Sequence, residues 1–239
     1  MQTDIFKTYK NVFDNSTVES IWYLITHHSI EGLESPIKIG KEANVFSSLT
    51  NEKERRAVKI YRVSVCDFFK MSKYLEMDSR FKFTRRRKQI VLIWAQREFK
   101  NLMKAYENNV SVPRPIAIRG NAIVMEFIGN PYPDEPRAAP MLKDTPINEK
   151  MPGKVIEEMK KLYKAGLVHG DLSEFNILNY KNKPIIIDLS HAIPVLSNSS
   201  HELLERDVQN ICKFFNRKGF DLNPVDVLKE IKSKSEVKN

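Results

Sequence analysis

A proline-dense segment divides this sequence into two halves with different patterns, and it limits the folds that the chain can adopt. Directly after Gly129 and Asn130 come five prolines within 16 residues: Pro131, Pro133, Pro136, Pro140 and Pro146. Proline lacks a backbone donor and fixes φ, so this density predicts an extended connector without regular structure. Strand-like alternation precedes it and helical spacing follows it. The sequence therefore predicts an α+β fold of two lobes, a small β-rich N-lobe and a helical C-lobe.

The first half predicts strands and one long helix, preceded by an extra N-terminal helix. A capping-box pattern with Ser16 as N-cap and Glu19 opposite it predicts a helix that closes near Gly32. We expect strands over 35–61, a polar basic stretch over 68–88, a helix over 89–108, and strands over 116–118 and 122–128. We therefore assign residues 1–34 to an N-terminal helical extension and residues 35–128 to the N-lobe.

The second half predicts helices around one short buried strand. A helix over 148–165 is expected to end at Gly166, and the apolar run over 184–188 is expected to form the strand. Further helices are predicted over 200–217 and 225–234, the last with Asn223 as N-cap and Pro224 at its first position. Residues 129–239 are thus assigned to the hinge, the connector and the C-lobe.

Basic residues are concentrated in one segment. The chain has a formal net charge of +9, and residues 68–88 alone hold eight basic and two acidic residues. Phe81 and Phe83 lie among these cations, just before the run Arg85-Arg86-Arg87-Lys88, and cations with aromatic residues favour RNA binding. The other interpretation is a solvated charge run at a helix N-terminus.

Composition limits where the protein acts. No apolar stretch approaches the ~20 residues that span a bilayer. The first residues lack the apolar region of a signal peptide, and two cysteines give no disulfide framework. We expect a cytoplasmic protein without a membrane partner, either a monomer or a weak dimer.

Four short elements could carry phosphoryl-transfer chemistry. Asp171 and Asn176 lie five residues apart in one loop, where the aspartate can orient a hydroxyl proton and the asparagine can offer an oxygen to Mg²⁺. Asp188 ends an apolar strand and can bind the same metal. Lys59 in a strand can neutralise the phosphates of a nucleotide, and Glu98 on the long helix can pair with that lysine.

Each of these residues also has an ordinary structural interpretation. A strand lysine is usually solvated, a helix glutamate usually lies on the surface, and Asp188 could cap a turn. Their order and spacing together are those of the protein-kinase set. Asp207, on an otherwise apolar helix, is expected to hold the backbone of the loop that carries Asp171.

The sequence resembles the RIO family of atypical protein kinases, and its type-1 branch most closely. The resemblance covers about residues 36–220. It is carried by the blocks GKEANVF from Gly40, AVKIY from Ala57, WAQREF from Trp94, MEFIG from Met125, HGDLSEFN from His169, IDLS from Ile187 and ERDV from Glu205. The GKEANVF block discriminates best, because small-molecule kinases carry loops similar to HGDLSEFN.

The resemblance implies a two-lobed, protein-kinase-like fold and an ATP site with Mg²⁺, or Mn²⁺ in its place. It implies a phosphate cover formed by Gly40, Lys41 and Glu42 in place of a multi-glycine loop. Ile39 and Val45 are expected over the adenine, Ala57 beside it, Met125 behind it, and Leu178 and Ile187 below it, with backbone groups of Glu126 and Ile128 on the base edge.

The resemblance also implies partners and regulation. It implies a role in maturation of the small ribosomal subunit, with contact to its precursor or rRNA through residues 68–88. The family's loop here is mobile and autophosphorylated, which makes Ser72, Ser79 and Thr84 candidate acceptors. Asp188 is the implied transient phosphoryl acceptor if the chain works as an ATPase, and the sequence specifies no protein substrate. Two alternatives remain: a small-molecule phosphotransferase of the aminoglycoside or choline-kinase type, and a non-catalytic ribosome-assembly factor.

Overall fold

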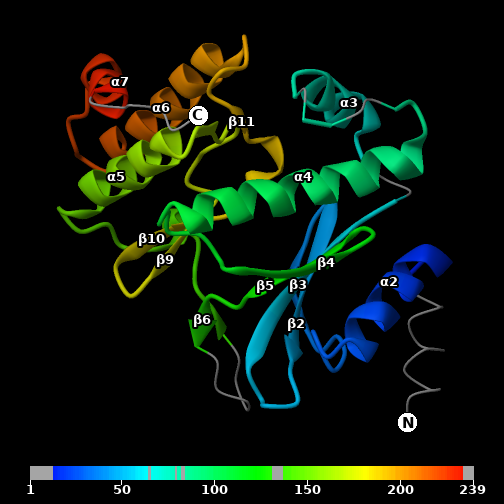
Figure 1. Cartoon of the computed structure of the whole chain (residues 1–239). Helices are drawn as coiled ribbons and strands as arrows, with labels where there is room; N and C mark the ends of the chain where they lie inside the picture. Colours follow the sequence, from blue (N-terminus) through cyan, green and yellow to red (C-terminus); the bar gives the residue numbers. More distant parts are fainter. Residues whose placement is uncertain (1–12, 64–65, 79, 82–83, 131–136, 234–239) are drawn as a thin grey trace. The chain divides into compact units, whose positions relative to one another are not determined.

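Two units share the chain in its computed structural model, which describes residues 13–63, 66–78, 80–81, 84–130 and 137–233 (Figure 1). Unit 1 comprises Met1–Glu76, Phe81–Phe99 and Arg114–Ala138. Unit 2 comprises Met77–Arg80, Lys100–Pro113 and Ala139–Asn239. No helix in the described part of the chain is long and apolar enough to cross a bilayer.

Unit 1 is built on an antiparallel sheet with the strand order β1-β2-β3-β5-β4. Its strands are β1 (Pro36–Ile39), β2 (Ala43–Leu49), β3 (Arg55–Tyr61), β4 (Pro115–Arg119) and β5 (Ala122–Glu126). Because side chains alternate along a strand, Val58 and Ile60 of β3 point to one face while Lys59 and Tyr61 point to the other.

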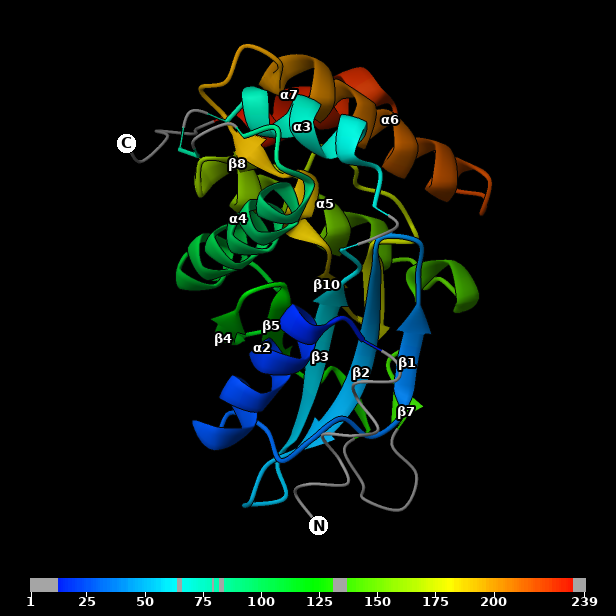
Figure 2. The same ribbon diagram turned by 90° about the vertical axis from the view of Figure 1, so that its right-hand side faces the viewer.

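Helix α2 (Asn15–Thr26) covers the first of these faces, beside β4 and β5 (Figures 1 and 2). Ile21 and Leu24 of the helix pack with Val58 and Ile60 of β3 in one buried cluster. The extra N-terminal helix is therefore part of the core of unit 1.

The prediction of the α2 cap was wrong. Asp14 is the N-cap, and its Oδ1 accepts from the backbone N–H of Ser16 and of Thr17, each at 3.1 Å. The helix ends at Thr26, well before Gly32. Asp14 is one of the best N-cap residue types, so it competes successfully with Ser16.

The basic stretch over 68–88 contains a helix that the sequence reading missed. Helix α3 (Phe68–Glu76) buries Met71, Tyr74 and Leu75, which follow helical spacing. Helix α4 (Arg87–Glu107) follows it and buries Ile90, Trp94 and Leu102 as predicted, whereas Tyr106 is 44% exposed.

The main helices of unit 2 are α5 (Met151–Lys164), α6 (Ser200–Asn216) and α7 (Pro224–Lys232), with α7 packed on both others (Figure 2). Gly166 follows the end of α5 with φ 76°, as the predicted C′ glycine requires. Asn223 caps α7 through a 2.9 Å bond from the N–H of Val225, which confirms the predicted cap.

Short strands complete both units. Unit 2 holds β8 (Leu167–Val168) paired with β11 (Ile193–Pro194), β9 (Ile177–Tyr180) paired with β10 (Lys183–Ile186), and the 3-10 turns η1 (Leu142–Asp144) and η2 (Leu189–His191). In unit 1, β6 (Gly129–Asn130) pairs with β7 (Arg137–Ala138). The proline-rich connector therefore contains some regular structure, because its prolines leave 129–130 and 137–138 free to pair. Pro131, Pro133 and Pro136 lie outside the described residues.

Candidate active site

A buried ion pair joins β3 to α4 in unit 1. Nζ of Lys59 donates to Oε1 of Glu98 at 2.7 Å, and the two side chains are 10% and 1% exposed. The sequence predicted this pairing, and the geometry agrees with it. The pair places an ammonium group, oriented by a carboxylate, on the sheet face opposite α2.

Tyr61 is a third member of this group, and the sequence reading gave it no role. Its hydroxyl donates a short hydrogen bond to Oε2 of Glu98. Lys59 and Tyr61 are two residues apart on β3, so both point to the same face and both oxygens of the carboxylate are engaged. The available signal was the alternation Lys59-Ile60-Tyr61, which directs Tyr61 to the face of Lys59.

Most of the predicted base-contacting residues of unit 1 share the face of Lys59. The strand register pairs Val45 with Lys59 and Ala57 with Met125. Ile39 departs from this prediction: it pairs with Asn44, which in turn pairs with Ile60, so the register directs it to the other face, and it is 73% exposed.

The turn between β1 and β2 depends on Gly40. Its N–H donates to the carbonyl oxygen of Ala43 at 3.1 Å. A Cβ added at Gly40 would lie 2.8 Å from that same oxygen, so the close turn excludes a side chain. Lys41, at the tip of this turn, is exposed, and Glu42 is partly buried.

The segment that begins at the end of β5 has few backbone groups available to a ligand. The N–H of Glu126 already donates to the carbonyl oxygen of Arg114 at 2.8 Å. Of the two backbone groups of Glu126, the carbonyl oxygen is therefore the one left to serve a ligand. Ile128, two residues on, is partly buried.

In unit 2 a tight hairpin brings Asn176 and Asp188 to the same place. Asn176 directly precedes β9, and Asp188 follows β10 by two residues. The hairpin turn has φ 51° at Lys181 and φ 60° at Asn182, as a two-residue turn of this kind requires. The N–H of Ile187 then donates to the carbonyl oxygen of Asn176 at 3.0 Å, which holds the two chain segments together.

The loop after β8 carries Asp171. Nδ2 of Asn176 donates to the carbonyl oxygen of Asp171 at 2.8 Å, which explains why the two residues stand five apart. His169 is buried, its Nε2 lies 3.1 Å from the carbonyl oxygen of Ile187, and its Nδ1 accepts from the N–H of Asp171 at 3.3 Å. These contacts assign the proton to Nε2. His169 therefore acts on the backbone of both loops, in agreement with a structural role.

Asp207 on α6 holds this loop as predicted. Its two carboxylate oxygens accept from the N–H of Gly170 and of Leu172, each at 2.8 Å. Burial is the main cause that raises the pKa of Asp207, to about 6, although His169 and the two backbone donors act against it. Arg206 and Asn210, on the same helix, donate to the carbonyl oxygens of Gly170 and Leu172.

Gly170 stands where many protein kinases carry an arginine. Its φ is +75°, and an added Cβ would lie 2.8 Å from the carbonyl oxygen of His191. Both features exclude a side chain, so the loop is built around glycine.

Asp188 adopts a left-handed backbone conformation, with φ 64° and ψ 62°. Its Oδ1 accepts from the hydroxyl of Ser190 at 2.8 Å, and Ser190 Oγ lies 3.3 Å from Nδ1 of His191. That nitrogen is 4.0 Å from Oδ2 of Asp171. The sequence reading missed His191, which lies one residue past the IDLS block.

The donor set of this loop pair fits a magnesium ion shared with phosphates. Mg²⁺ prefers oxygen ligands and usually binds one or two protein carboxylates, together with substrate phosphates and water. Asp188 offers a carboxylate, and Asn176 offers its side-chain oxygen because its amide nitrogen is engaged with Asp171. In the part of the chain that the structure describes, no group of three His, Cys, Asp or Glu side chains could bind a metal alone.

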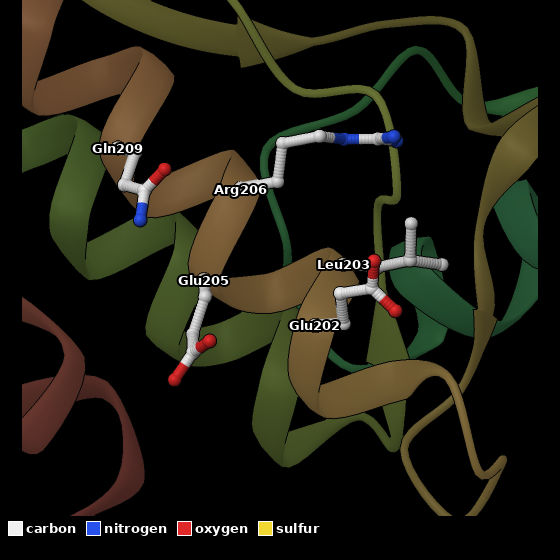
Figure 3. A pocket seen from close by; sticks show the side chains of 5 residues that line it. All are labelled: Glu202, Leu203, Glu205, Arg206 and Gln209. Atoms are coloured by element: carbon white, nitrogen blue, oxygen red, sulfur yellow. The ribbon is translucent and has the colours of Figure 1, made fainter.

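A pocket of about 240 Å³ lies on α6 and is lined by Glu202, Leu203, Glu205, Arg206 and Gln209 (Figure 3). Its lining is mainly charged or polar and provides no apolar floor for a base. Arg206 extends from this group to its bond with Gly170. The pocket thus includes Arg206, one of the residues that hold the loop of Asp171.

The basic run is exposed in unit 1. Arg85, Arg86, Arg87 and Lys88 lie on the surface, at the start of α4. Phe69 of α3 is 85% exposed, and the guanidinium of Arg87 lies 5.2 Å from the ring centroid of Phe68. The predicted acceptor Ser79 and the predicted aromatic contact Phe83 lie outside the described residues.

The fold and these two residue groups define a class: a phosphotransferase of the protein-kinase type. Comparisons with known proteins are more specific, because a profile of the RIO domain matches residues 44–228. The chain belongs to the RIO family.

Two archaeal relatives match over most of their length. The RIO-type serine/threonine-protein kinase Rio1 of Methanocaldococcus jannaschii is 42% identical over 232 residues, or 95% of this chain and 78% of that protein. Its counterpart in Haloferax volcanii is 40% identical over 220 residues, or 91% and 75%. The predicted RIO-family membership, and with it an ATP-dependent phosphotransferase of the kinase class, is confirmed.

A solved structure supports the fold. The Rio2 kinase from Chaetomium thermophilum, in an ADP/Mg²⁺-phosphoaspartate complex, matches with a TM-score of 0.71 and 22% identity, over 93% of this chain and 68% of that one. The predicted kinase-like α+β fold is confirmed.

Proposed function

We propose that this chain is a Mg²⁺-ATP-dependent serine/threonine kinase and ATPase of the RIO type, which acts in the cytoplasm in maturation of the small ribosomal subunit. One observation carries the proposal: the β9–β10 hairpin and the bond from Asn176 to Asp171 gather Asp171, Asn176 and Asp188 on two adjoining loops. Two carboxylates and an amide oxygen at this spacing suit a metal-assisted transfer of a phosphoryl group.

Each residue has a distinct role in the proposal. Lys59 neutralises the nucleotide phosphates, and Glu98 keeps its ammonium in place, as the buried 2.7 Å pair supports. Asn176 and Asp188 would hold Mg²⁺, or Mn²⁺ in its place. The ion would screen phosphate charge against the approaching nucleophile.

Asp171 orients the acceptor. In the kinase reaction a serine or threonine hydroxyl gives its proton to the carboxylate of Asp171 while its oxygen bonds to the γ-phosphorus and the bond to ADP breaks. The Asp171 side chain is 49% exposed, which suits a group that must meet an external hydroxyl.

The proposed nucleotide contacts leave out Ile39, because the strand register directs it to the other face of the sheet. We propose Val45, Ala57 and Met125 as base contacts from the sheet face of Lys59, together with Leu178 and Ile187. The carbonyl oxygen of Glu126 and the backbone of Ile128 would bind the base edge. Gly40, Lys41 and Glu42 would cover the phosphates.

A second branch of the proposal is an ATPase cycle. The related Rio2 structure carries a phosphoaspartate. Here the carboxylate of Asp188 would take the γ-phosphoryl group as ADP leaves, and water would then hydrolyse the acyl phosphate to inorganic phosphate. The same residue would thus serve as a metal ligand and as a transient acceptor.

The exposed run Arg85–Lys88 is the proposed contact to the subunit precursor or its rRNA. Four adjacent cations suit a phosphate backbone. Ser72 and Thr84 remain proposed autophosphorylation acceptors. A small-molecule phosphotransferase is less well supported, because the relatives matched at 40% identity or more are named protein kinases.

The test is ATP turnover with Mg²⁺, measured with and without a purified small-subunit precursor. Stimulation by the precursor in the wild type, and its loss in Asp188→Asn, would support the ATPase branch. Phosphate transfer to a protein without stimulated ATP hydrolysis would support the kinase branch. Absence of both reactions would refute the proposed function.

A further inference from the structure

Asn101 is a buried amide in the middle of a long helix, at a place where helices usually carry an apolar residue. It is fully buried in unit 2, in the second part of α4. Asparagine is a poor helix former, and a buried polar group must find partners to offset its lost hydration. The partners of Asn101 therefore indicate why it is there.

The amide of Asn101 spans the turn that follows Asp188. Its Nδ2 donates to the carbonyl oxygens of Leu189 and Ala192, at 3.0 and 2.9 Å. Its Oδ1 accepts from Nη2 of Arg80 at 2.9 Å. The orientation of the amide is fixed, because a carbonyl can only accept and a guanidinium can only donate.

Arg80 is held in turn by Asp78. Nε and Nη2 of Arg80 donate to the two carboxylate oxygens of Asp78, at 2.8 and 2.7 Å, and the backbone N–H of Arg80 donates to the same carboxylate at 3.2 Å. The Asp78 side chain is fully buried, whereas that of Arg80 is 30% exposed. Such a two-pronged pair fixes the direction of the guanidinium as well as its position.

The turn that Asn101 holds needs such support. A non-glycine residue in the left-handed region, as at Asp188, is less favourable than one in ordinary backbone conformation. It persists where neighbouring contacts determine the chain path. Leu189 and Ala192 bracket η2, directly after Asp188, so the amide of Asn101 holds both ends of that turn.

We propose that Asn101 is a positioning residue for the metal ligand Asp188, and that Asp78 and Arg80 set how firmly it holds the turn. This inference rests on the proposed function, because it assigns the role through the metal that Asp188 would bind. As a consequence, Asp78 and Arg80, which precede the basic run, are connected to the Asp188 turn through the side chain of Asn101.

The decisive variants change the hydrogen bonds of the Asn101 amide with little change in side-chain size. Asn101→Asp keeps the size but removes both N–H groups and turns a charge toward two carbonyl oxygens. Arg80→Lys keeps the positive charge but loses the two-pronged pair with Asp78. Because the Arg80 side chain is 30% exposed, we expect this variant to fold. Glu107→Gln, on an exposed position of the same helix, is the matched control.

Two functional measurements, with hydrogen exchange as a third, separate a positioning role of Asn101 from a general effect on stability. We expect Asn101→Asp to raise the Mg²⁺ concentration for half-maximal ATP turnover about tenfold, the size expected for two lost hydrogen bonds. Arg80→Lys should raise it several-fold, and Glu107→Gln should leave it unchanged. Affinity for nucleotide without metal should stay unchanged in all three.

Hydrogen–deuterium exchange over residues 187–194 gives the independent test. Faster exchange there in Asn101→Asp and in Arg80→Lys, with the wild-type rate in Glu107→Gln, would support the role of the cluster. Unchanged exchange in both variants would overturn the inference even in an active enzyme. A wild type without Mg²⁺-dependent turnover would instead refute the proposed function. An unshifted Mg²⁺ midpoint in an active, folded Asn101→Asp would contradict the positioning role alone.

Discussion

Glu98 and Lys59 form a 2.7 Å ion pair across 39 positions of sequence, with only 1% of the Glu98 side chain exposed. The hydroxyl of Tyr61 engages the second carboxylate oxygen. Lys59 and Tyr61 both lie on β3, a central strand of the sheet. Unit 1 therefore holds its lysine in place through its own core.

Breaking this pair should destabilise the protein strongly. Glu98→Ala leaves the ammonium of Lys59 buried without its carboxylate, and we expect a loss of about 3–5 kcal/mol in the free energy of unfolding. The double variant Lys59→Met/Glu98→Leu should recover much of that loss, since no buried charge remains. Urea unfolding measures both.

An exposed pair provides the control for that experiment. Lys229 and Asp226 lie 3.9 Å apart with 75% and 71% of their side chains exposed, so Asp226→Ala should change stability very little. Equal losses in Glu98→Ala and Asp226→Ala would contradict the importance of burial.

Removal of the Tyr61 hydroxyl should weaken ATP binding while the fold survives. Tyr61→Phe keeps the ring and removes the hydrogen bond to Glu98, so we expect a loss of about 1.5–3 kcal/mol in stability, the range for hydrogen bonds to charged groups. Calorimetric titration should show several-fold weaker ATP binding. Tyr106→Phe, at a 44% exposed position, should match the wild type in both measurements.

Gly170→Ala should be costly for two separable reasons. The positive φ costs about 1–2 kcal/mol for alanine, and the new Cβ would lie 2.8 Å from the carbonyl oxygen of His191. Gly219→Ala has the same backbone problem, at φ +92°, but meets no atom within 4 Å. The midpoint of thermal unfolding and the activity should therefore fall further in Gly170→Ala than in Gly219→Ala. Equal effects in the two variants would exclude the contact with His191 as a cause.

The pH dependence of activity should contain a step near pH 6 from Asp207. Burial raises its pKa from 3.8 to about 6 in the folded protein. Between these values only the folded state holds the proton, so this group favours folding below its unfolded pKa, and that contribution is lost as the pH rises through 6. The proton nevertheless occupies an oxygen that accepts from Gly170 or Leu172.

Activity should accordingly fall as the pH drops through about 6, without a parallel loss of stability from this group. The wild-type rate against pH measures the step, and circular dichroism follows the fold. Asp207→Asn should have lower activity at all pH values and should lack the step. A step of unchanged size in that variant would assign it to another group.

The sequence singled out the candidate site residues more readily than the residues that support them. Lys59, Glu98, Asp171, Asn176 and Asp188 could be proposed because phosphoryl transfer restricts residue type and order. Asp207 could be found because a carboxylate on an apolar helix face must have donors. These constraints act within short patterns that a single sequence displays.

The supporting residues lacked such patterns. Asn101 meets Leu189 and Ala192 across 88 and 91 positions, and no local rule connects them. The available signal was that Asn101, a polar residue, directly precedes Leu102 on the buried face of α4. Helix α3 was missed because the charges of 68–88 obscured the spacing of Met71, Tyr74 and Leu75. Ile39 was misplaced because strand register depends on how the β1–β2 turn closes.

The most direct test of the account is transfer of the γ-phosphoryl group from labelled ATP in the presence of Mg²⁺. The wild type should label protein or release phosphate, and Asp171→Ala should transfer no label to protein while it binds ATP with wild-type affinity. Asp221→Ala, on an exposed position of unit 2, should behave as the wild type. Full phosphate transfer to protein by Asp171→Ala would contradict the central claim.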